Sequence, residues 1–172
     1  MNWSNWIPRE TATLCFIRVE DRLLLIRKKR GLGAGKINAP GGRIEPGETA
    51  REAAVRETGE EVGVVPHDLE KRGELHFQFL DGYSLHCTVF LARGCTGEPV
   101  ETDEADPFWC AIRDLPYQDM WADDLHWLPL VIDGKNFLGY FEFDDEKMLS
   151  HRVEIVEGFS REDQNQKLIV ES

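Results

Sequence analysis

The sequence has few of the features that mark secreted, membrane-spanning or nucleic-acid-binding proteins. Its 172 residues include four cysteines (Cys15, Cys87, Cys95 and Cys110), which form neither a C-x-x-C pair nor a zinc-like spacing. No apolar stretch approaches membrane-spanning length, and the first ten residues lack the basic and apolar regions of a signal peptide. The 32 acidic and 20 basic residues give a formal charge of -12. We therefore expect a cytoplasmic protein with reduced thiols and with neither a membrane nor a polymeric nucleic acid as partner.

Repeats and low-complexity tracts are also absent from the sequence, and its length suits one domain with a sizeable core. We predict a single domain over residues 1–157 and a polar tail over residues 158–172. The five histidines show no metal-ligand spacing, so we expect surface or edge positions for them. Apolar runs and turn signals predict two hairpins (11–19 with 23–26, and 75–80 with 85–92), strands at 108–112 and 137–143, and helices at 50–62 and 125–132. This order indicates an α+β fold with a mixed sheet between helices.

The most informative run is GRIEPGETAREAAVRETGEEVGV, at residues 42–64. Pro46 and Gly47 predict a turn, and Thr49 is a suitable N-cap for a helix. Helix-forming residues then continue over 50–62 without proline, and Gly63 tolerates the backbone conformation that ends a helix.

Three glutamates of this helix point to a metal site. Glu57, Glu60 and Glu61 are three and four residues apart, so they project from one face and repel one another. A hard divalent cation relieves that repulsion, and Mg²⁺ commonly bridges carboxylates to the phosphates of a substrate. Arg56 stands four residues before Glu60 and is placed to orient it. A solvated acidic face is the simpler explanation for any one glutamate, but the whole spaced run favours metal binding.

The run resembles the Nudix box, from which it departs only at Thr58, where the pattern prefers an aliphatic residue. The resemblance implies a Nudix fold, with the mixed sheet sandwiched between helices as α/β/α. Outside the box, the chain from about Thr11 to about Val153 resembles the animal 8-oxo-dGTP diphosphatases, which hydrolyse oxidised purine nucleoside triphosphates. The segments that carry this second resemblance are 28–38, 77–79, 97–104, 119–127 and 134–143.

The resemblance also implies a set of metal ligands and catalytic groups. The Gly42 carbonyl and the side chains of Glu57, Glu60 and Glu61 would bind the metal, usually Mg²⁺, with Mn²⁺ as the alternative ion. Glu104 would bring a further carboxylate to the metal from a loop. Glu61 is the first catalytic candidate, and the other members of the catalytic set are Arg56, Glu57 and Glu104.

For the base, the resemblance implies that Asn38, Asp123 and Asp124 read an oxidised purine. Two adjacent carboxyls beside an apolar wall do not both ionise cheaply, so one keeps a proton and donates while the other accepts. A pair of helix-capping residues is the alternative explanation for Asp123 and Asp124. The remaining substrate-binding residues implied by the resemblance are the aromatic walls Trp121 and Phe77, the floor residue Thr13, and Lys28 near the sugar and phosphates. Leu32 and Leu85 depart from the family, which carries Phe and Met there.

These observations predict an enzyme that hydrolyses a nucleoside triphosphate to the monophosphate and pyrophosphate, with an oxidised purine nucleotide such as 8-oxo-dGTP or 2-hydroxy-dATP as substrate. For the oligomeric state, which no sequence feature indicates, we favour a monomer. Water would attack a phosphorus of the triphosphate, and metal ions would activate it and neutralise the leaving group. The alternatives are a Nudix hydrolase of another nucleotide (a normal nucleoside triphosphate or a nucleotide sugar) and a non-catalytic nucleotide-binding module.

Overall fold

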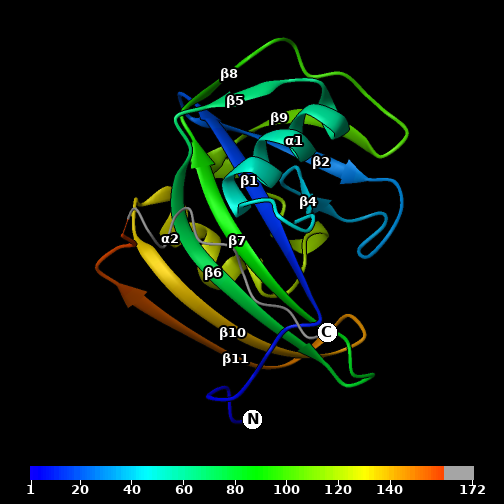
Figure 1. Cartoon of the computed structure of the whole chain (residues 1–172). Helices are drawn as coiled ribbons and strands as arrows, with labels where there is room; N and C mark the ends of the chain where they lie inside the picture. Colours follow the sequence, from blue (N-terminus) through cyan, green and yellow to red (C-terminus); the bar gives the residue numbers. More distant parts are fainter. Residues whose placement is uncertain (161–172) are drawn as a thin grey trace.

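The computed structural model describes residues 1–160, so most of the predicted tail lies outside the described residues. Figure 1 shows a large curved sheet with helix α1 (Ala50–Val62) on one face and helix α2 (Asp124–Ile132) on the other. Two separate apolar clusters hold these layers together. One packs α1 against strands of the sheet, and the other packs α2, through the buried Trp127, against the opposite face. The predicted α+β fold with a sheet between helices is confirmed.

The large sheet is mixed, because β1 pairs in parallel with β7 and β6 with β10, while its other pairs are antiparallel. Its order is β11-β10-β6-β7-β1-β2-β3, with β4 paired to β1 and β9 paired to β2. A second sheet joins β5 to β8. The strands are β1 (Glu10–Val19), β2 (Arg22–Lys28), β3 (Ile37–Asn38), β4 (Gly41–Arg43), β5 (Val65–His67), β6 (Glu70–Phe79), β7 (Ser84–Ala92), β8 (Gly94–Thr96), β9 (Ala105–Ala111), β10 (Asn136–Asp144) and β11 (Lys147–Val156).

Helix α1 begins and ends at the predicted residues because its local signals agree. The Thr49 hydroxyl accepts a hydrogen bond from the Glu52 N–H, and the Glu52 carboxylate accepts one from the Thr49 N–H, which completes a capping box. At the other end, Gly63 has a φ of 75° and its N–H donates to the Gly59 carbonyl. The helix therefore holds a fixed length and rotation above β1 and β4.

Helix α2 begins at Asp124, one residue before its predicted start. Asp123 occupies the N-cap position, but its side chain makes no capping hydrogen bond. Two short 3-10 turns (Ile112–Asp114 and Tyr117–Asp119) connect β9 to this helix. Within residues 1–160, neither α1 nor α2 has the length and apolar character needed to cross a membrane.

Several features of the structure differ from the sequence expectations. The predicted hairpins are present, but β6 begins at Glu70, five residues before the predicted Leu75, and β11 was not predicted. His86 is only 6% exposed, so its predicted surface position is wrong. Its Nε2 lies within hydrogen-bonding distance of Glu74 Oε1, at 2.9 Å. All four cysteines are free thiols, as predicted, and Cys15 and Cys87 are buried.

Candidate functional site

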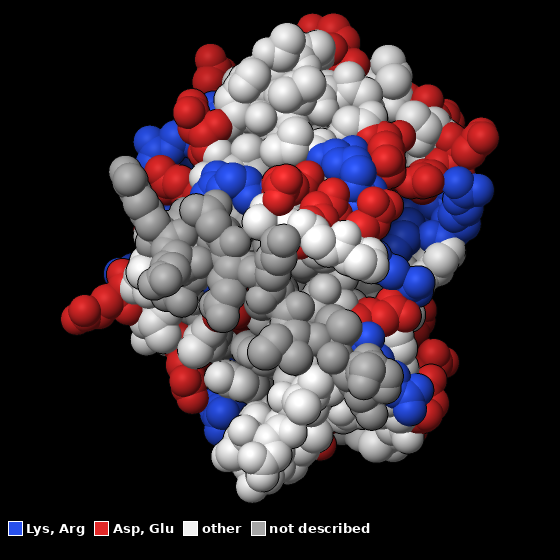
Figure 2. Space-filling model, viewed as in Figure 1, with Lys and Arg blue, Asp and Glu red and all other residues white. Residues whose placement is uncertain are grey.

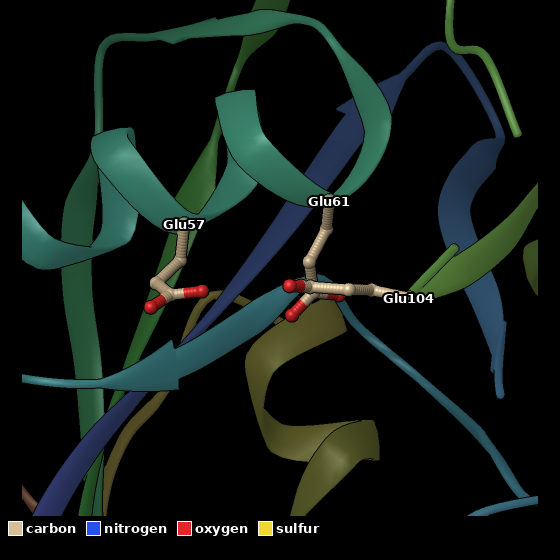
Figure 3. A group of neighbouring side chains, drawn as sticks. All are labelled: Glu57, Glu61 and Glu104. Carbon is tan, nitrogen blue, oxygen red and sulfur yellow. The ribbon is translucent and has the colours of Figure 1, made fainter. Parts of the chain in front are cut away.

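Helix α1 and the loop before β9 bring three carboxylates together. Figure 3 shows Glu57 and Glu61 descending from successive turns of α1, with Glu104 reaching toward Glu61 from the neighbouring loop. One oxygen of each side chain lies within 4.8 Å of the others. Thr102 fixes the loop to the helix, because its hydroxyl donates to the Glu61 carbonyl over 2.6 Å and accepts from the Glu104 N–H over 3.2 Å. We call Glu57, Glu61 and Glu104 the carboxylate trio.

The trio is electrostatically unfavourable without a cation. Burial, reinforced by the charge of Glu57, raises the pKa of Glu61 to about 8. Burial likewise raises the pKa of Glu57, although hydrogen bonding to Arg56 opposes the shift. Glu61 Oε2 is buried and has no hydrogen-bond partner. An orphaned carboxylate oxygen among three acceptor-only groups matches the ligand preference of Mg²⁺, so these residues fit a divalent metal ion.

Arg56 organises the edge of the trio. Its guanidinium donates two hydrogen bonds to Glu48, of 2.7 and 2.9 Å, and one of 2.8 Å to Glu57. A longer bond of 3.2 Å reaches Glu60, and another of 3.0 Å reaches the Arg43 carbonyl. Because a bidentate pairing fixes a guanidinium in its plane, Glu48 holds Arg56 and Arg56 in turn holds the Glu57 carboxylate.

Glu60 and Gly42 occupy different positions relative to the trio. The Glu60 side chain is 54% exposed and lies outside the group, with its carboxylate turned to Arg56. Gly42 lies directly against Glu57, and a Cβ atom at this position would collide with the Glu57 carboxyl group. A glycine is therefore required where β4 passes the helix, and this contact leaves the backbone of β4 beside the trio.

A cavity extends from Glu61 across the α2 face of the sheet. Its empty space, counted together with the open solvent at its mouth, is about 800 Å³. Its wall is mostly apolar, with a few polar groups facing inward. The predicted substrate-binding residues Thr13, Lys28, Asn38, Phe77, Trp121, Asp123 and Asp124 all line it, together with Leu32 and Leu85.

Asp123 and Asp124 form the most deeply buried acidic group of the cavity, with exposures of 1% and 3%. Burial raises the pKa of both carboxyls, and the hydrogen bond between them together with the charge of Asp123 raises that of Asp124 further. Trp127 Nε1 donates to Asp123 Oδ2 over 2.7 Å, which favours the ionised form of Asp123. Asp123 Oδ1 and Asp124 Oδ2 are buried without partners. The pair thus presents a proton and an acceptor to the cavity.

The aromatic side of the cavity is built around Trp121. Phe79 and Phe143 meet its indole edge to face, with ring centroids 6.3 and 5.5 Å away. Gly33, in the loop after β2, has a φ of 81°, and a Cβ there would lie 2.7 Å from Trp121 Nε1. The glycine-rich loop therefore packs its backbone directly on the indole, which supports a flat apolar wall.

Sequence reasoning missed two residues that the structure places at these groups. Glu48 is the bidentate partner of Arg56, and its fixed place in the 42–64 run was the available signal. Lys36 contacts the Trp121 ring from the glycine-rich loop, and no spacing in the sequence indicated this contact.

The fold and the site together place three carboxylates, which suit a divalent cation, beside a mostly apolar cavity. The chain belongs to the NUDIX domain family, whose model matches residues 8–131.

Individual relatives are similar over most of their length. An oxidized purine nucleoside triphosphate hydrolase from Danio rerio is 42% identical over 84% of this chain and 94% of its own. The enzyme with the same name from Mus musculus is 38% identical over 86% of this chain and 96% of its own. Among solved structures, a mutator MutT protein from Bacillus halodurans has a TM-score of 0.76 and 27% identity, covering 84% of this chain and 97% of its own.

Proposed function

We propose that this protein hydrolyses oxidised purine nucleoside triphosphates to the monophosphate and pyrophosphate. The observation that carries the proposal is a single cavity with Glu61 of the carboxylate trio at one end and the Asp123–Asp124 pair at the other. Such a cavity offers one acidic group to a metal-bound triphosphate and another to a purine. The two animal relatives named oxidized purine nucleoside triphosphate hydrolase support the same substrate class.

The trio is the proposed site of a divalent metal ion, Mg²⁺ or Mn²⁺, with the Gly42 carbonyl as a further ligand. Bound there, such an ion supplies charge neutralisation for the phosphates and acidifies a water molecule. The chain's own groups do the positioning. Arg56 fixes Glu57, and Lys28, which lines the cavity near Glu61, offers a cation to the phosphate chain. Glu60, more exposed, is proposed as an outer member of the ligand set.

Recognition of the base is assigned to the polar groups at the other end. The shared proton of Asp123 and Asp124 lets the pair donate one hydrogen bond and accept another, which suits a purine edge altered by oxidation. Asn38 lies nearby, with its Oδ1 accepting from the Ala39 N–H over 2.8 Å, and its amide N–H groups remain as donors. Trp121 and Phe77 provide stacking surfaces.

The test is a substrate panel. Oxidised and normal purine nucleoside triphosphates are compared by kcat/KM with Mg²⁺, and the products are identified by chromatography. The expected result is the highest kcat/KM for an oxidised purine, with monophosphate and pyrophosphate as products. A preference for a normal nucleoside triphosphate or a nucleotide sugar would replace the proposed substrate. Tight binding without turnover would instead indicate a binding module.

The remaining proposals concern the protein's surroundings. Free thiols at all four cysteines suit a reducing compartment, and we propose the cytoplasm. On the face shown in Figure 2, acidic and basic residues lie in small, interspersed groups, which fits the proposed absence of polymeric nucleic acid among its partners. We also propose a monomer, to be checked by light scattering.

A further inference from the structure

Lys36 lies behind the Trp121 wall of the cavity and links three segments of the chain: the glycine-rich loop, the indole of Trp121 and the turn after β10. It is the last residue of the glycine-rich loop before β3, and its side chain is only 24% exposed. Its Nζ stands 5.3 Å from the centroid of the Trp121 ring. The same Nζ is 3.7 Å from Glu146 Oε2, in the turn between β10 and β11. An ammonium group held by a carboxylate on one side and an indole on the other has a restricted position.

The loop that carries Lys36 is itself fixed by backbone hydrogen bonds. The Lys36 N–H donates to the Gly33 carbonyl over 2.9 Å, and the Lys36 carbonyl accepts from the Lys28 N–H over 3.0 Å. The Gly35 N–H donates to the Lys28 carbonyl over 2.7 Å. Since Gly33 also packs on the indole, the loop, Trp121 and the Lys36 ammonium form one packed unit.

Lys36 also acts electrostatically on the acidic pair. The titratable or hydrogen-bonding groups that face Asp123 and Asp124 come from several elements: Trp127 from α2, Tyr117 from the 3-10 turn before it, Cys87 from β7, and Lys36 from the loop. Of these four, Lys36 alone carries a positive charge. Burial and the neighbouring Asp123 raise the pKa of Asp124, and the charge of Lys36 opposes that rise by a smaller amount.

The number of protons on the pair decides what it recognises. With one proton, the pair offers one donor and retains an ionised acceptor. With two protons, it loses its charge and its strongest acceptor. Burial alone favours uptake of the second proton, because it penalises every ionised carboxyl. A nearby cation therefore has a defined function here, which is to keep one carboxylate ionised.

We propose that Lys36 is a positioning and specificity residue of the base pocket, which sets the charge of the Asp123–Asp124 pair and holds the Trp121 wall. The specificity role rests on the proposed function, in which the pair recognises the oxidised purine. The effect of Lys36 on the charge of the pair does not depend on any substrate, because that charge is a property of the free protein.

The primary test is therefore made without nucleotide. The ¹³C carboxyl signals of Asp-labelled protein are titrated between pH 4 and 9, and the pair is identified by the signals that change in Asp124→Asn. In Lys36→Met, which removes the charge but keeps an apolar stem, the midpoint of the pair should rise by about one pH unit. Lys36→Arg keeps the cation and should restore the midpoint to that of the wild type.

The matched control is Lys135→Met, at an exposed lysine beyond the other end of α2. It removes the same charge from the protein but should leave the midpoint unchanged. A wild-type midpoint in Lys36→Met would overturn the proposal, as would an equal shift in Lys135→Met. Circular dichroism of each variant confirms the folded state, and Lys36→Gln provides a second neutral variant.

A kinetic test connects this charge to specificity. At pH 7.5, Lys36→Met should lose about tenfold in kcat/KM on an oxidised purine nucleoside triphosphate, through KM rather than kcat. Lys36→Arg should recover most of that loss. If the protein turns over no oxidised purine, the proposed function fails, while the carboxyl titration still decides the role of Lys36. If kcat falls and KM stays constant, Lys36 serves the phosphates and the specificity role is wrong.

Discussion

The molecule contains two groups of crowded carboxyls, and their surroundings give them different chemistry. The carboxylate trio lies beside Arg56, and the Glu104 side chain is 40% exposed. The Asp123–Asp124 pair lies at the apolar end, almost completely buried against Trp127. Burial raises pKa values in both places. The trio has a half-exposed member, Glu104, and a guanidinium beside Glu57, whereas both members of the pair are buried and an indole N–H donates to Asp123.

This difference shows that carboxyl crowding alone does not define a metal site. Mg²⁺ needs several oxygen ligands that converge on one point. Three carboxylates converge in the trio, whereas the pair offers only two and desolvation penalises its second charge. The same residue chemistry would therefore bind a cation at the trio and present a hydrogen-bond donor at the pair.

The largest expected effect comes from neutralising the centre of the trio. Glu61→Gln keeps the shape of the side chain but removes its charge and its capacity to accept a proton. We expect kcat/KM to fall by about two orders of magnitude or more. Steady-state kinetics with Mg²⁺ measures this, and Glu98→Gln on an exposed loop serves as control. Glu60→Gln should lose less, because Glu60 lies outside the trio. A folded Glu61→Gln variant with near wild-type turnover would refute the metal assignment.

The next effect concerns the acidic pair and should be selective. Asp124→Ala removes the group that donates the shared proton, so discrimination in favour of an oxidised purine should fall by about 1–3 kcal/mol, or roughly 5- to 150-fold. The ratio of kcat/KM for oxidised and normal nucleotides measures this. Hydrolysis of the normal nucleotide should change little, because the trio is intact. An equal loss on every substrate would instead indicate a structural role at the start of α2.

The carboxylate trio and the Asp123–Asp124 pair also differ in how well the sequence predicted them. Helix α1 was predicted to the residue, since its cap, its stop and its spacing are local signals. The spacing of three and four residues placed Glu60 with Glu57 and Glu61 on one face, but only the latter two turn toward β4. Glu104 joins them through a fold-level contact, which periodicity cannot indicate and for which the family resemblance was the guide.

Around the base pocket, local signals were weaker. Asp123 and Asp124 were equally consistent with helix capping, and only the tertiary structure shows Asp123 bound to Trp127 instead. Strand β11 was missed because it is an edge strand with mostly exposed residues, so it lacks the alternation that marks a half-buried strand. Lys36 reaches Trp121 and Glu146 across the fold, which no sequence spacing encodes.

A substitution in the aromatic wall at Trp121 tests whether base binding and phosphate binding use different parts of the cavity. Trp121→Ala should weaken binding of an oxidised purine monophosphate by about 1–3 kcal/mol, the usual contribution of base–aromatic stacking. Binding of pyrophosphate, which uses the trio and not the wall, should not change. Isothermal calorimetry measures both ligands, and Trp121→Phe, which retains a stacking face, should keep most of the affinity. Equal weakening of both ligands would mean that Trp121 supports the whole cavity and not the base.

The smallest expected effect is on stability, and it depends on pH through the centre of the trio. Because the folded protein holds a proton on Glu61 up to about pH 8, well above the value of an unfolded glutamate, its ionisation opposes folding. Metal-free protein should therefore lose stability as pH rises from 6.5 to 8.5, with Tm falling by about 2–4 °C. The two histidines of lowered pKa, His76 and His126, have the opposite effect, because stability rises with pH until the unfolded histidine value of 6.5 is passed, at the start of this window. Differential scanning calorimetry in EDTA measures how steeply Tm falls with pH, and Glu61→Gln should make that fall less steep.

Mg²⁺ at pH 8.5 should restore Tm in the wild type but restore less in Glu61→Gln. A metal-free Tm that rises over this window would show that Glu61 is ionised and stabilised by its neighbours, and the trio would then need no cation to relieve it.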